Sequence, residues 1–500
     1  MKLKRVALIT PPYHSGVVES AGTWMNLGFV YIAGALRAAG YEVDYYDAMA
    51  LWHEWPQIRQ RITDFSPDVV ATSAFTPCIV DGVELLRLAK EINPRIVTVI
   101  GNVHATFCYD ELFSDAATPI DFVIRGEGEI TFPALLDCLN SGDDPIKVAG
   151  LAFRSHGKVH ATANAPFIEN LDALPAAWDL VEWPIYSYRP KKDSTLAIVS
   201  SSRGCRQNCS FCSQQLFWQR TWRARSPENF VAELEHLNRE YGVNVAMLAD
   251  EIPTLDRARW ERILDLLIER QPGVKLLMET RVDDILRDED IMDKYRKAGI
   301  EHIYVGVEAG SQKNLNLFKK GTKVEQSKRA IDIINSADIV SETSFVLGMP
   351  DDTPESIAAI VALAIHYNPD MAFFLAIAPW PYADLYPTLQ KYVAVTDYRK
   401  YNLVEPVLKP EAMSLKELEM ELGKAARTFF MHKFQNLDQL SPWKQEFMTE
   451  VFKLLINNSY LAKQMREMAT QGETMPAAIK NALQKPTAES LPAQAIPPIP

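Results

Sequence analysis

The sequence has no long apolar run, and this limits how the chain can meet a membrane. The longest such run, "SIAAIVALAIHY" at 356–367, is shorter than the ~20 residues that a membrane-spanning helix needs. The first segment, "MKLKRVALITPPYHSG", has only about five apolar residues before its double proline, too few for a secretory signal peptide. We therefore expect neither a membrane anchor nor export.

Cysteine is also scarce, with six residues in a chain of 500. A small secreted domain held together by disulfides carries far more cysteine for its length. We therefore expect a cytoplasmic protein whose thiols are reduced and available to bind metal.

An excess of positive charge is missing too: Asp and Glu number 64 against 52 Lys and Arg, a net charge of -12. Binding of nucleic acid in general needs a basic face, so we expect no nucleic-acid partner. The one basic cluster lies beside three of the cysteines. It is either a solvated rim or a site for an anionic or electron-rich ligand, and its members are Arg203, Arg206, Arg220, Arg223 and Arg225.

A chain of 500 residues is long enough for two or three domains. Residues 1–145 alternate β-branched runs with amphipathic helical patterns. This alternation predicts an α/β domain with a doubly wound, Rossmann-like parallel sheet, which binds ligands at the carboxyl ends of its strands. The expected strands are "RVALIT", "YEVDYYDA", "DVVATSAFT", "RIVTVIGNVHA" and "DFVIRGEGE".

The predicted ends of these strands are small, polar or glycine-containing. Such residues leave room for a large flat ligand and expose backbone N–H groups to it, although small residues are also ordinary in turns. The positions are Thr10, Ser73, Thr76, Gly101, Thr106, Gly126 and Glu127.

The remainder of the chain divides into four parts. Residues 146–194 form a predicted linker, and 195–395 repeat a strand–helix unit six times, which predicts a partial (β/α)6 barrel with its chemistry at the carboxyl ends of the strands. Residues 396–470 form a predicted helical region, in which Ser414-x-x-Glu417 is a capping box. The last part, 471–500, is rich in Ala and Pro and is predicted to be disordered.

Three cysteines stand close together in "SSRGCRQNCSFCSQQ". Cys205, Cys209 and Cys212 are one thiolate short of a four-ligand zinc site, and no second Cys-x2-Cys follows. A [4Fe–4S] cluster held by three thiolates leaves one iron open to another ligand, so the spacing favours a cluster over zinc. The remaining cysteines are scattered and are expected to be core residues: Cys78, Cys108 and Cys138.

This spacing, directly after the first strand of a parallel barrel, resembles the radical S-adenosylmethionine (radical SAM) superfamily. The resemblance implies that Cys205, Cys209 and Cys212 hold a [4Fe–4S] cluster whose open iron chelates SAM. One electron would then cleave SAM to methionine and a 5′-deoxyadenosyl radical. The resemblance also implies SAM contacts near later strand ends, for which packing or salt-bridge roles stay open: Phe211, Asp250, Arg281, Glu308 and Gly348.

The first domain resembles the cobalamin-binding domain of class B radical SAM enzymes, through "TPP", "YIAGALRAAGYEVDYYDA", "TSAFTP", "GNVHATF" and "VIRGEGE". The strand-end positions above, together with His104, are the implied cobalamin contacts. None of the nine histidines has the Asp two positions before it that the cobalt-ligating Asp-x-His-x-x-Gly motif requires. His104 comes nearest, but Asn102 precedes it and Phe107 replaces the glycine. The resemblance therefore implies cobalamin without an imidazole ligand, and a degenerate domain that binds nothing stays open.

The most specific resemblance is to the anaerobic magnesium-protoporphyrin IX monomethyl ester oxidative cyclases, and related branches include the hopanoid C-3 methylases. The segments that carry it include "YHSG", "CSFCSQ", "LADEIPT", "TRVDDILRDE" and "PWPYADLYP", whereas "ESAGTWMNLGFVY" departs from the cyclases. From the resemblance we expect a cobalamin-dependent radical SAM C-methyltransferase acting on an unactivated carbon of a large apolar substrate, with a hopanoid-like polycyclic lipid favoured. The cyclase reaction is the alternative, and a non-catalytic iron–sulfur or cobalamin sensor is a third.

The aromatic residues near the last barrel strand bear on the substrate. They either line a pocket for an apolar molecule or pack in the barrel core: Phe373, Phe374, Trp380, Tyr382 and Tyr386. The expected partners are a reductant such as flavodoxin or ferredoxin and, for a lipid substrate, a peripheral contact with a membrane.

Overall fold

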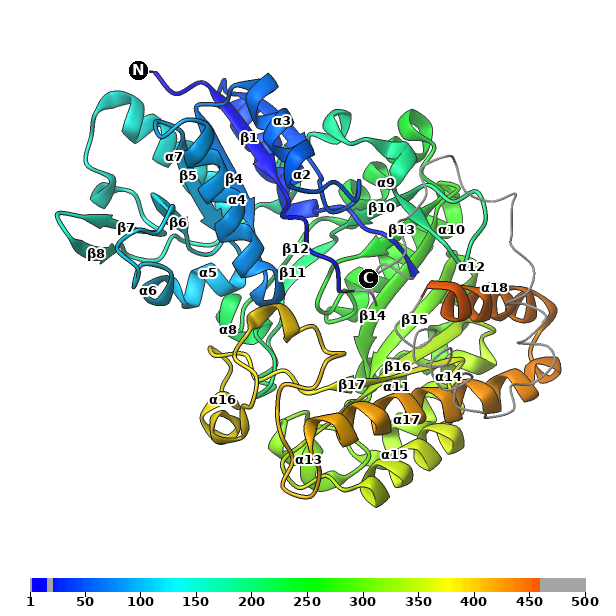
Figure 1. The fold of residues 1–500 in the computed structure, drawn as a ribbon. Helices are drawn as coiled ribbons and strands as arrows, with labels where there is room; N and C mark the ends of the chain where they lie inside the picture. The colour runs from blue at the N-terminus through cyan, green and yellow to red at the C-terminus, as the bar shows by residue number, and fades with distance from the viewer. Residues whose placement is uncertain (1, 16–20, 459–500) are drawn as a thin grey trace.

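The computed structural model of the chain describes residues 2–15 and 21–458, and it arranges them in two α/β units followed by two long helices (Figure 1). The first unit is built on a seven-stranded sheet and the second on a six-stranded sheet. The predicted disordered tail at 471–500 lies outside the described residues.

Five short strands form the parallel part of the first sheet. They are β1 (Arg5–Ile9), β3 (Glu42–Tyr46), β4 (Val69–Ser73), β5 (Val97–Gly101) and β6 (Phe122–Ile124). The order β3-β1-β4-β5-β6 confirms the doubly wound sheet. The connections diverge between β1 and β4, which is where sheets of this kind bind ligands.

Helices cover both faces of this sheet, which explains why most of its strand residues are apolar; the start of the edge strand β3, with Glu42 and Asp44, is the exception. Alternate residues of β1 point to opposite faces: Leu8 packs with α2 (Leu27–Ala38) and α7 (Gly128–Ser141), and Ile9 with α3 (Trp55–Phe65) and α4 (Ile79–Ile92). Two short helices follow β5, namely α5 (Val103–Phe107) and α6 (Tyr109–Leu112).

The stretch expected to be a linker contributes more structure than its composition indicates. Two of its segments, β7 (Leu151–Ser155) and β8 (Lys158–Ala161), extend the first sheet beyond β6 as antiparallel strands. A third, β9 (Ser187–Tyr188), pairs with β2 (Gly22–Thr23). The sheet therefore continues past residue 145, because β7 and β8 are hydrogen-bonded to its edge rather than forming a free connection.

The second sheet consists of six parallel strands paired in chain order. They are β10 (Leu196–Val199), β13 (Val245–Leu248), β14 (Lys275–Arg281), β15 (Ile300–Gly306), β16 (Val340–Leu347) and β17 (Met371–Ala376). Within the described residues β17 is not paired with β10, so this is the partial barrel that the repeated strand–helix pattern predicts.

Helices cover the outside of the partial barrel. Ser226 caps α9 (Pro227–Tyr241), whose residues Phe230, Val231, Leu234 and Leu237 are buried. The other helices of this layer are α10 (Arg257–Arg270), α11 (Val282–Arg287), α12 (Met292–Lys297), α13 (Gln312–Leu317), α14 (Val324–Ser336) and α15 (Pro354–Tyr367).

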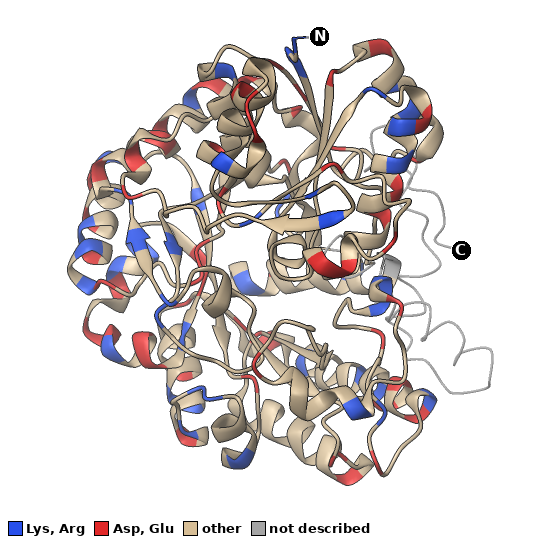
Figure 2. Ribbon diagram, turned by 90° about the vertical axis from the view of Figure 1, so that its left-hand side faces the viewer, with Lys and Arg blue, Asp and Glu red and all other residues tan. Residues whose placement is uncertain are grey.

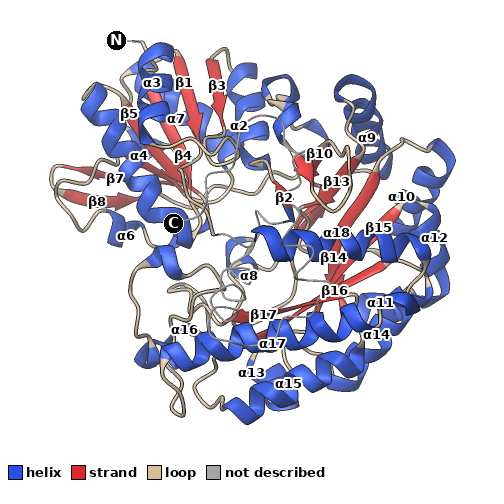
Figure 3. Ribbon diagram, turned by 45° about the vertical axis from the view of Figure 1, so that its right-hand side comes forward, coloured by secondary structure: helices blue, strands red, loops and turns tan. Residues whose placement is uncertain are grey.

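Of the predicted helical region 396–470, the described chain is helical from Leu415 onward, 401–414 is a loop, and 459–470 lie outside the described residues. Ser414 and Glu417 form the capping box of α17 (Leu415–Gln435), which lies along α15 and β17 and is followed by α18 (Pro442–Asn458) (Figure 3). Acidic and basic residues are intermixed along the outer helices (Figure 2). Within residues 2–15 and 21–458, we find no helix with the length and apolarity to cross a bilayer.

Candidate functional site

The three clustered cysteines lie in a loop that a small hairpin holds at the end of the first barrel strand. Strands β11 (Ser202–Gly204) and β12 (Trp222–Ala224) pair antiparallel and frame residues 205–221, which we call the cysteine loop and which also contains α8 (Gln214–Phe217). Gly204 has φ 98°, and a Cβ there would lie 2.3 Å from the carbonyl oxygen of Thr221. Only glycine therefore allows the two strands to come this close.

The three thiols sit at a depth that suits a covered metal site. Cys209 is buried, and Cys205 and Cys212 are half-buried. Burial raises the pKa of Cys205 to about 11 and that of Cys212 to about 12. Both sulfurs are therefore protonated near neutral pH unless a metal displaces the proton.

The spacing of the sulfurs argues against a single ion. A tetrahedral zinc with Zn–S bonds of about 2.3 Å would hold its sulfurs about 3.8 Å apart. Among the described residues, the one group of three potential ligands whose atoms all lie within 4.8 Å of one another is His104, Cys108 and Glu111, and the clustered cysteines do not meet that limit. The sulfurs are therefore not gathered as ligands of one tetrahedral ion, and the Cys-x3-Cys-x2-Cys sequence spacing remains the ground for expecting a cluster.

Two adjacent acids follow β13, and their roles differ from the sequence expectation. Asp250 is fully buried and accepts hydrogen bonds from the backbone and hydroxyl of Ser201 and from the hydroxyl of Ser202, at 2.5–2.7 Å. Glu251 instead accepts from the backbone N–H of Gly204, at 2.9 Å, and from the indole N–H of Trp218, at 2.5 Å. The acid that contacts the cysteine loop is therefore Glu251, and Asp250 holds the turn before that loop.

Three charged side chains converge at the ends of β14 and β15. Lys320 forms a buried ion pair with Glu308 at 2.8 Å, and its carbonyl accepts from the guanidinium of Arg281. Arg281 also donates to Asp283, at 2.8 Å, and its positive charge opposes the rise in the Cys205 thiol pKa. Arg281 and Glu308 thus lie at the strand ends, as the sequence analysis expects. Lys320 was not predicted as a site residue, because no sequence motif marks it.

The backbone at the end of β15 is shaped around this ion pair. Glu308 adopts φ 64°, a left-handed conformation that costs free energy for a residue other than glycine. A Cβ at Gly306 would lie 2.5 Å from Glu308 Oε1 and 2.7 Å from Lys320 Nζ. The absence of a side chain at Gly306 therefore makes room for the pair.

Glu279 is a further acid in the barrel interior that sequence reasoning missed. It lies on β14 opposite Tyr304 of β15, on the same side of the strand as Arg281. Burial, followed by the charges of Glu251 and Glu308, raises the pKa of Glu279 to about 8. A glutamate inside a strand carries no sequence motif, so only the strand's register could have indicated it.

Two other expected SAM contacts occupy packed positions. Phe211 packs edge-to-face on Phe318, with ring centroids 5.0 Å apart. Gly348 has φ 83°, and a Cβ there would lie 2.8 Å from a methyl carbon of Leu418 in α17. Of the aromatic residues near β17, Phe373 and Phe374 pack on α17, as core residues do.

The expected residues of the first unit gather at one edge of its sheet. The amide of Asn102 donates to Ser73, at 2.9 Å, and the backbone N–H of Gly126 donates to Thr106, at 3.1 Å. Thr10, directly after β1, is buried, and its hydroxyl donates to Asp47 at 2.8 Å. These bonds order the ends of β4, β5 and β6, with Gly101 at the end of β5, into a continuous rim.

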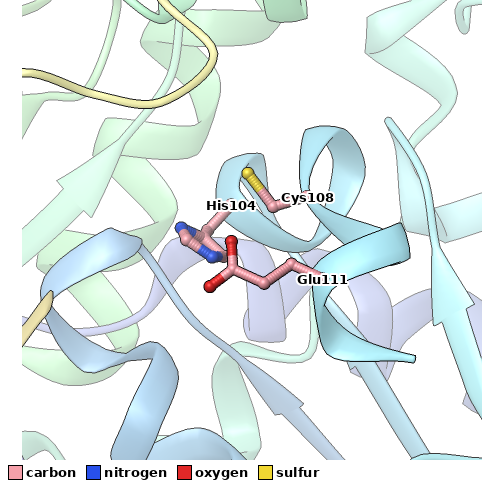
Figure 4. A group of neighbouring side chains, drawn as sticks. All are labelled: His104, Cys108 and Glu111. Atoms are coloured by element: carbon pink, nitrogen blue, oxygen red, sulfur yellow. The ribbon is translucent and has the colours of Figure 1, made fainter. Parts of the chain in front are cut away.

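His104 lies at this rim with one ring nitrogen unsatisfied. The side chain is fully buried; its Nδ1 lies 3.1 Å from the hydroxyl of Thr76, and its Nε2 has no hydrogen-bond partner within the described chain. Burial lowers the pKa of His104 to about 4, so the ring is neutral. Figure 4 shows the imidazole beside Cys108 and Glu111. An unsatisfied buried nitrogen at the ligand-binding edge fits a polar group of a bound cofactor.

The second unit also reaches this rim. The hydroxyl of Tyr382 lies 2.7 Å from that of Thr76, and Tyr382 stacks on Phe107 with ring centroids 5.3 Å apart. Tyr398 packs edge-to-face on the His104 ring and donates to Glu111 at 3.1 Å. Tyr382 is thus a contact between the units and not a residue of the barrel core.

Glu127 differs from its expected role. One carboxylate oxygen accepts from Arg203 and Arg223, at 2.7 and 3.1 Å, and the other from Arg223 and the backbone N–H of Ile168, at 2.9 and 2.8 Å. These four contacts use the accepting capacity of the carboxylate, so nothing is left for cobalamin. Arg203 and Arg223 are correspondingly largely buried, with side chains 12% and 9% exposed, and only Arg206 and Arg220 of the basic cluster are exposed.

Comparisons with known proteins agree with both units. Residues 13–136 match the family profile described as B12 binding domain, and residues 199–364 match that of the radical SAM superfamily. The anaerobic magnesium-protoporphyrin IX monomethyl ester cyclase of Rubrivivax gelatinosus is 41% identical over 434 residues, covering 86% of this chain and 78% of that protein. The hopanoid C-3 methylase of Methylococcus capsulatus is 26% identical over 408 residues, covering 81% and 76%.

A solved structure has the same overall fold. The radical S-adenosylmethionine methyltransferase TsrM of Kitasatospora setae, with cobalamin and a [4Fe-4S] cluster bound, superposes with a TM-score of 0.63 at 18% identity, covering 84% of this chain and 82% of that one. At this identity the likeness concerns the fold: an N-terminal sheet unit followed by a partial barrel and C-terminal helices.

Proposed function

This chain belongs to the cobalamin-binding (class B) radical SAM enzymes, and from that membership we propose that it cleaves SAM and uses the radical on an unactivated carbon of a large, flat, apolar substrate. The cluster, when bound, supplies the electron that cleaves SAM, and cobalamin supplies a second redox or group-carrying centre. We assign the cluster to Cys205, Cys209 and Cys212, and cobalamin to the rim that holds Ser73, Thr76, Gly101, His104, Thr106 and Gly126.

The chain's own side chains support a SAM site beside the cysteine loop. Glu251 restrains the loop through Gly204 and Trp218 and leaves its carboxylate half-buried. Arg281 is a cation beside the cysteines, suited to a carboxylate, and the Glu308–Lys320 pair presents both a donor and an acceptor. Together they offer complementary partners for the amino, carboxylate and ribose groups of SAM.

For the substrate, we propose a magnesium porphyrin and oxidative ring closure. The observation that supports this assignment is the 41% identity with the Rubrivivax cyclase over 86% of the chain, which includes both units. Sequence features by themselves favoured methylation of a polycyclic lipid, and this stays the second candidate because the hopanoid C-3 methylase aligns over 81% of the chain.

A single labelling experiment distinguishes the two reactions. The reconstituted, reduced enzyme is incubated with SAM carrying a deuterated methyl group, in parallel with magnesium-protoporphyrin monomethyl ester and with a hopanoid lipid. Cyclisation predicts an oxidised porphyrin without deuterium, together with 5′-deoxyadenosine. Deuterium in the hopanoid would instead establish methylation and reject the porphyrin assignment. If no 5′-deoxyadenosine is formed, the radical SAM assignment itself fails.

A further inference from the structure

The contact between the two units is built on a cluster of four largely buried charges. Glu127 and Glu129 come from the turn after β6 and the start of α7, and Arg203 and Arg223 come from β11 and β12. Besides the Glu127 contacts described above, Arg203 donates to Glu129 at 2.6 Å. The four side chains are only 5–12% exposed. We call this group the Glu–Arg clamp.

The clamp holds the cysteine loop at both of its ends. Arg203 lies two residues before Cys205, and Arg223 is its direct partner across the β11–β12 hairpin. The two arginines therefore leave the hairpin side by side, one at the start of the loop and the other at its end. On the opposite side, Glu251 anchors Gly204 and Trp218 to the barrel. The loop is thus fixed between the barrel and the N-terminal sheet.

Charge makes this contact specific for one arrangement of the two units. Two adjacent guanidinium groups repel each other, as do two adjacent carboxylates, so neither pair is stable when buried alone. Aromatic faces add to the fit, because Arg203 lies over Tyr31 at 5.3 Å and Arg223 over Phe167 at 4.6 Å. A shift of either unit would leave charges buried without partners.

The ion pair between Arg399 and Asp81 also joins the two units, but it should stabilise their contact less than the clamp does. Arg399 approaches Asp81 at 3.3 Å, but its side chain is 44% exposed, and exposed ion pairs contribute little. The buried clamp is accordingly the better candidate for holding one unit against the other. On one side, the clamp residues Arg203 and Arg223 flank the cysteine loop. On the other side, Glu127 and Glu129 follow the turn after β6, next to the proposed cobalamin rim.

We propose that Glu129, Arg203 and Arg223, together with Glu127, are positioning residues that set the separation between the cluster and the cobalamin. This inference rests on the proposed function for its two cofactors. The clamp acts through the loop and the turn, so its loss should leave SAM cleavage intact and impair the use of the radical. Radical formation needs only the cluster and SAM, whereas the later step needs the cobalamin at the right distance.

Two clamp variants and one control variant distinguish a role in positioning the cysteine loop from a general contribution to protein stability. Glu129→Gln removes one charge while keeping the shape, and Arg203→Lys keeps the charge but loses the two-pronged geometry. The matched control is Asp370→Asn, which breaks the buried Lys444–Asp370 pair of 2.7 Å, between α18 and the start of β17. This pair is buried like the clamp but contacts neither the cysteine loop nor the rim.

The first measurement needs no cofactor. In hydrogen–deuterium exchange of the full chain, Glu129→Gln and Arg203→Lys should each speed exchange in 202–204 and 222–224 by about 10-fold, and Asp370→Asn should not. Unchanged exchange in both clamp variants would overturn the proposal, whatever reaction the enzyme catalyses. If one clamp variant does not fold, the exchange rates of the other clamp variant test the proposal.

The second measurement uses the reconstituted enzyme. The ratio of 5′-deoxyadenosine to product should rise about 10-fold in both clamp variants, with the rate of SAM cleavage within about twofold of wild type. Asp370→Asn should keep the wild-type ratio even if it lowers the melting temperature. A normal ratio in both clamp variants would overturn the positioning role. Absence of 5′-deoxyadenosine in the wild type would instead count against the proposed function, and exchange alone would then decide on the clamp.

Discussion

At the scale of single residues, the cysteine loop brings three thiols together, and burial keeps two of them, Cys205 and Cys212, protonated until metal binds. Raised pKa values, about 11 for Cys205 and about 12 for Cys212, protect the sulfurs from oxidation, because the thiolate is the reactive form. Arg281 lies close enough to oppose this effect and to favour the thiolate once iron is present.

We predict that Cys209→Ala loses the cluster. One of its three sulfur ligands is then missing, so absorbance near 400 nm, roughly where thiolate-to-iron charge transfer falls, should disappear along with SAM cleavage. Visible spectroscopy and 5′-deoxyadenosine analysis after reconstitution measure both. Cys138→Ala, in α7 and outside the loop, should keep both properties. A Cys209→Ala protein that retained the absorbance would contradict the assignment of these ligands.

Glu279 is the single residue with the clearest consequence for pH dependence. Its carboxyl faces Glu251, Glu308, Asp250 and Lys320, and its pKa is raised from 4.5 to about 8. Between these two values the folded chain holds a proton that the unfolded chain has released. Stability therefore decreases as the pH rises across this interval, which is the opposite of the usual behaviour of a salt-bridged carboxylate.

We predict that Glu279→Gln flattens this dependence. The limiting slope for one proton is about 1.4 kcal/mol per pH unit, and the real slope should be smaller because the side chain is only half-buried. Urea unfolding of the chain at about pH 5 and about pH 8 measures the difference. The wild type should lose more stability over this interval than the variant. Equal losses would show that Glu279 is not protonated in the folded chain.

At the scale of elements, α17 protects the last strand of the partial barrel. Within the described residues β17 pairs only with β16, and α17 packs along β17 and α15. Phe429 and Phe430 pack on Phe374 and Phe373, and the capping box at Ser414 sets where the helix begins. A covered edge strand cannot pair with other chains, so α17 supports both folding and solubility.

We predict a large loss of stability for Phe429→Ala. The side chain is fully buried, so the variant leaves a cavity and should lower the free energy of unfolding by about 3–5 kcal/mol. Met420→Ala in the same helix is the control: Met420 is 55% exposed, and its loss should change that free energy by no more than about 0.5 kcal/mol. Urea titration measures both. Similar effects of the two variants would mean that α17 is not packed on the barrel as described.

At the scale of the whole molecule, the proposed cofactor sites meet where the two units contact each other. His104 of the first unit is enclosed by Tyr382 and Tyr398 of the second, and the Glu–Arg clamp joins the same surfaces nearby. A ligand held at the rim is therefore covered by residues from both halves of the chain. Neither unit by itself would contain the complete site.

We predict that His104→Phe weakens cobalamin binding by about 10-fold, because phenylalanine keeps the packing but removes the nitrogen that now lacks a partner. The cobalamin retained after gel filtration, measured from its visible spectrum, tests this. Cys108→Ser is the control, since it leaves the imidazole in place, and it should bind like the wild type. Wild-type affinity of a folded His104→Phe protein would exclude His104 from the cobalamin site.

Much of this architecture could be predicted from the sequence because it depends on local patterns. Apolar runs such as "RVALIT" and capping signals such as the box of Ser414 and Glu417 determine strands and helices over a few residues, and the observed α17 begins directly after Ser414. The three cysteines could also be predicted as ligands from the sequence, because their spacing is contained in a motif of eight residues. The first part of the expected linker was harder to predict, because β7 is a strand only by pairing with β6, and β8 only by pairing with β7.

By itself, then, the sequence determined the fold class, the family and the cysteine triplet, because each is encoded by residues close together in the chain. Only the tertiary structure decided which acids are available for ligands. It showed that Glu127 and Asp250 are consumed by partners far away in sequence, and that Glu251, Glu279 and Lys320 line the barrel interior. Partners separated by many residues are brought together by packing of the two units, and no local pattern records that packing.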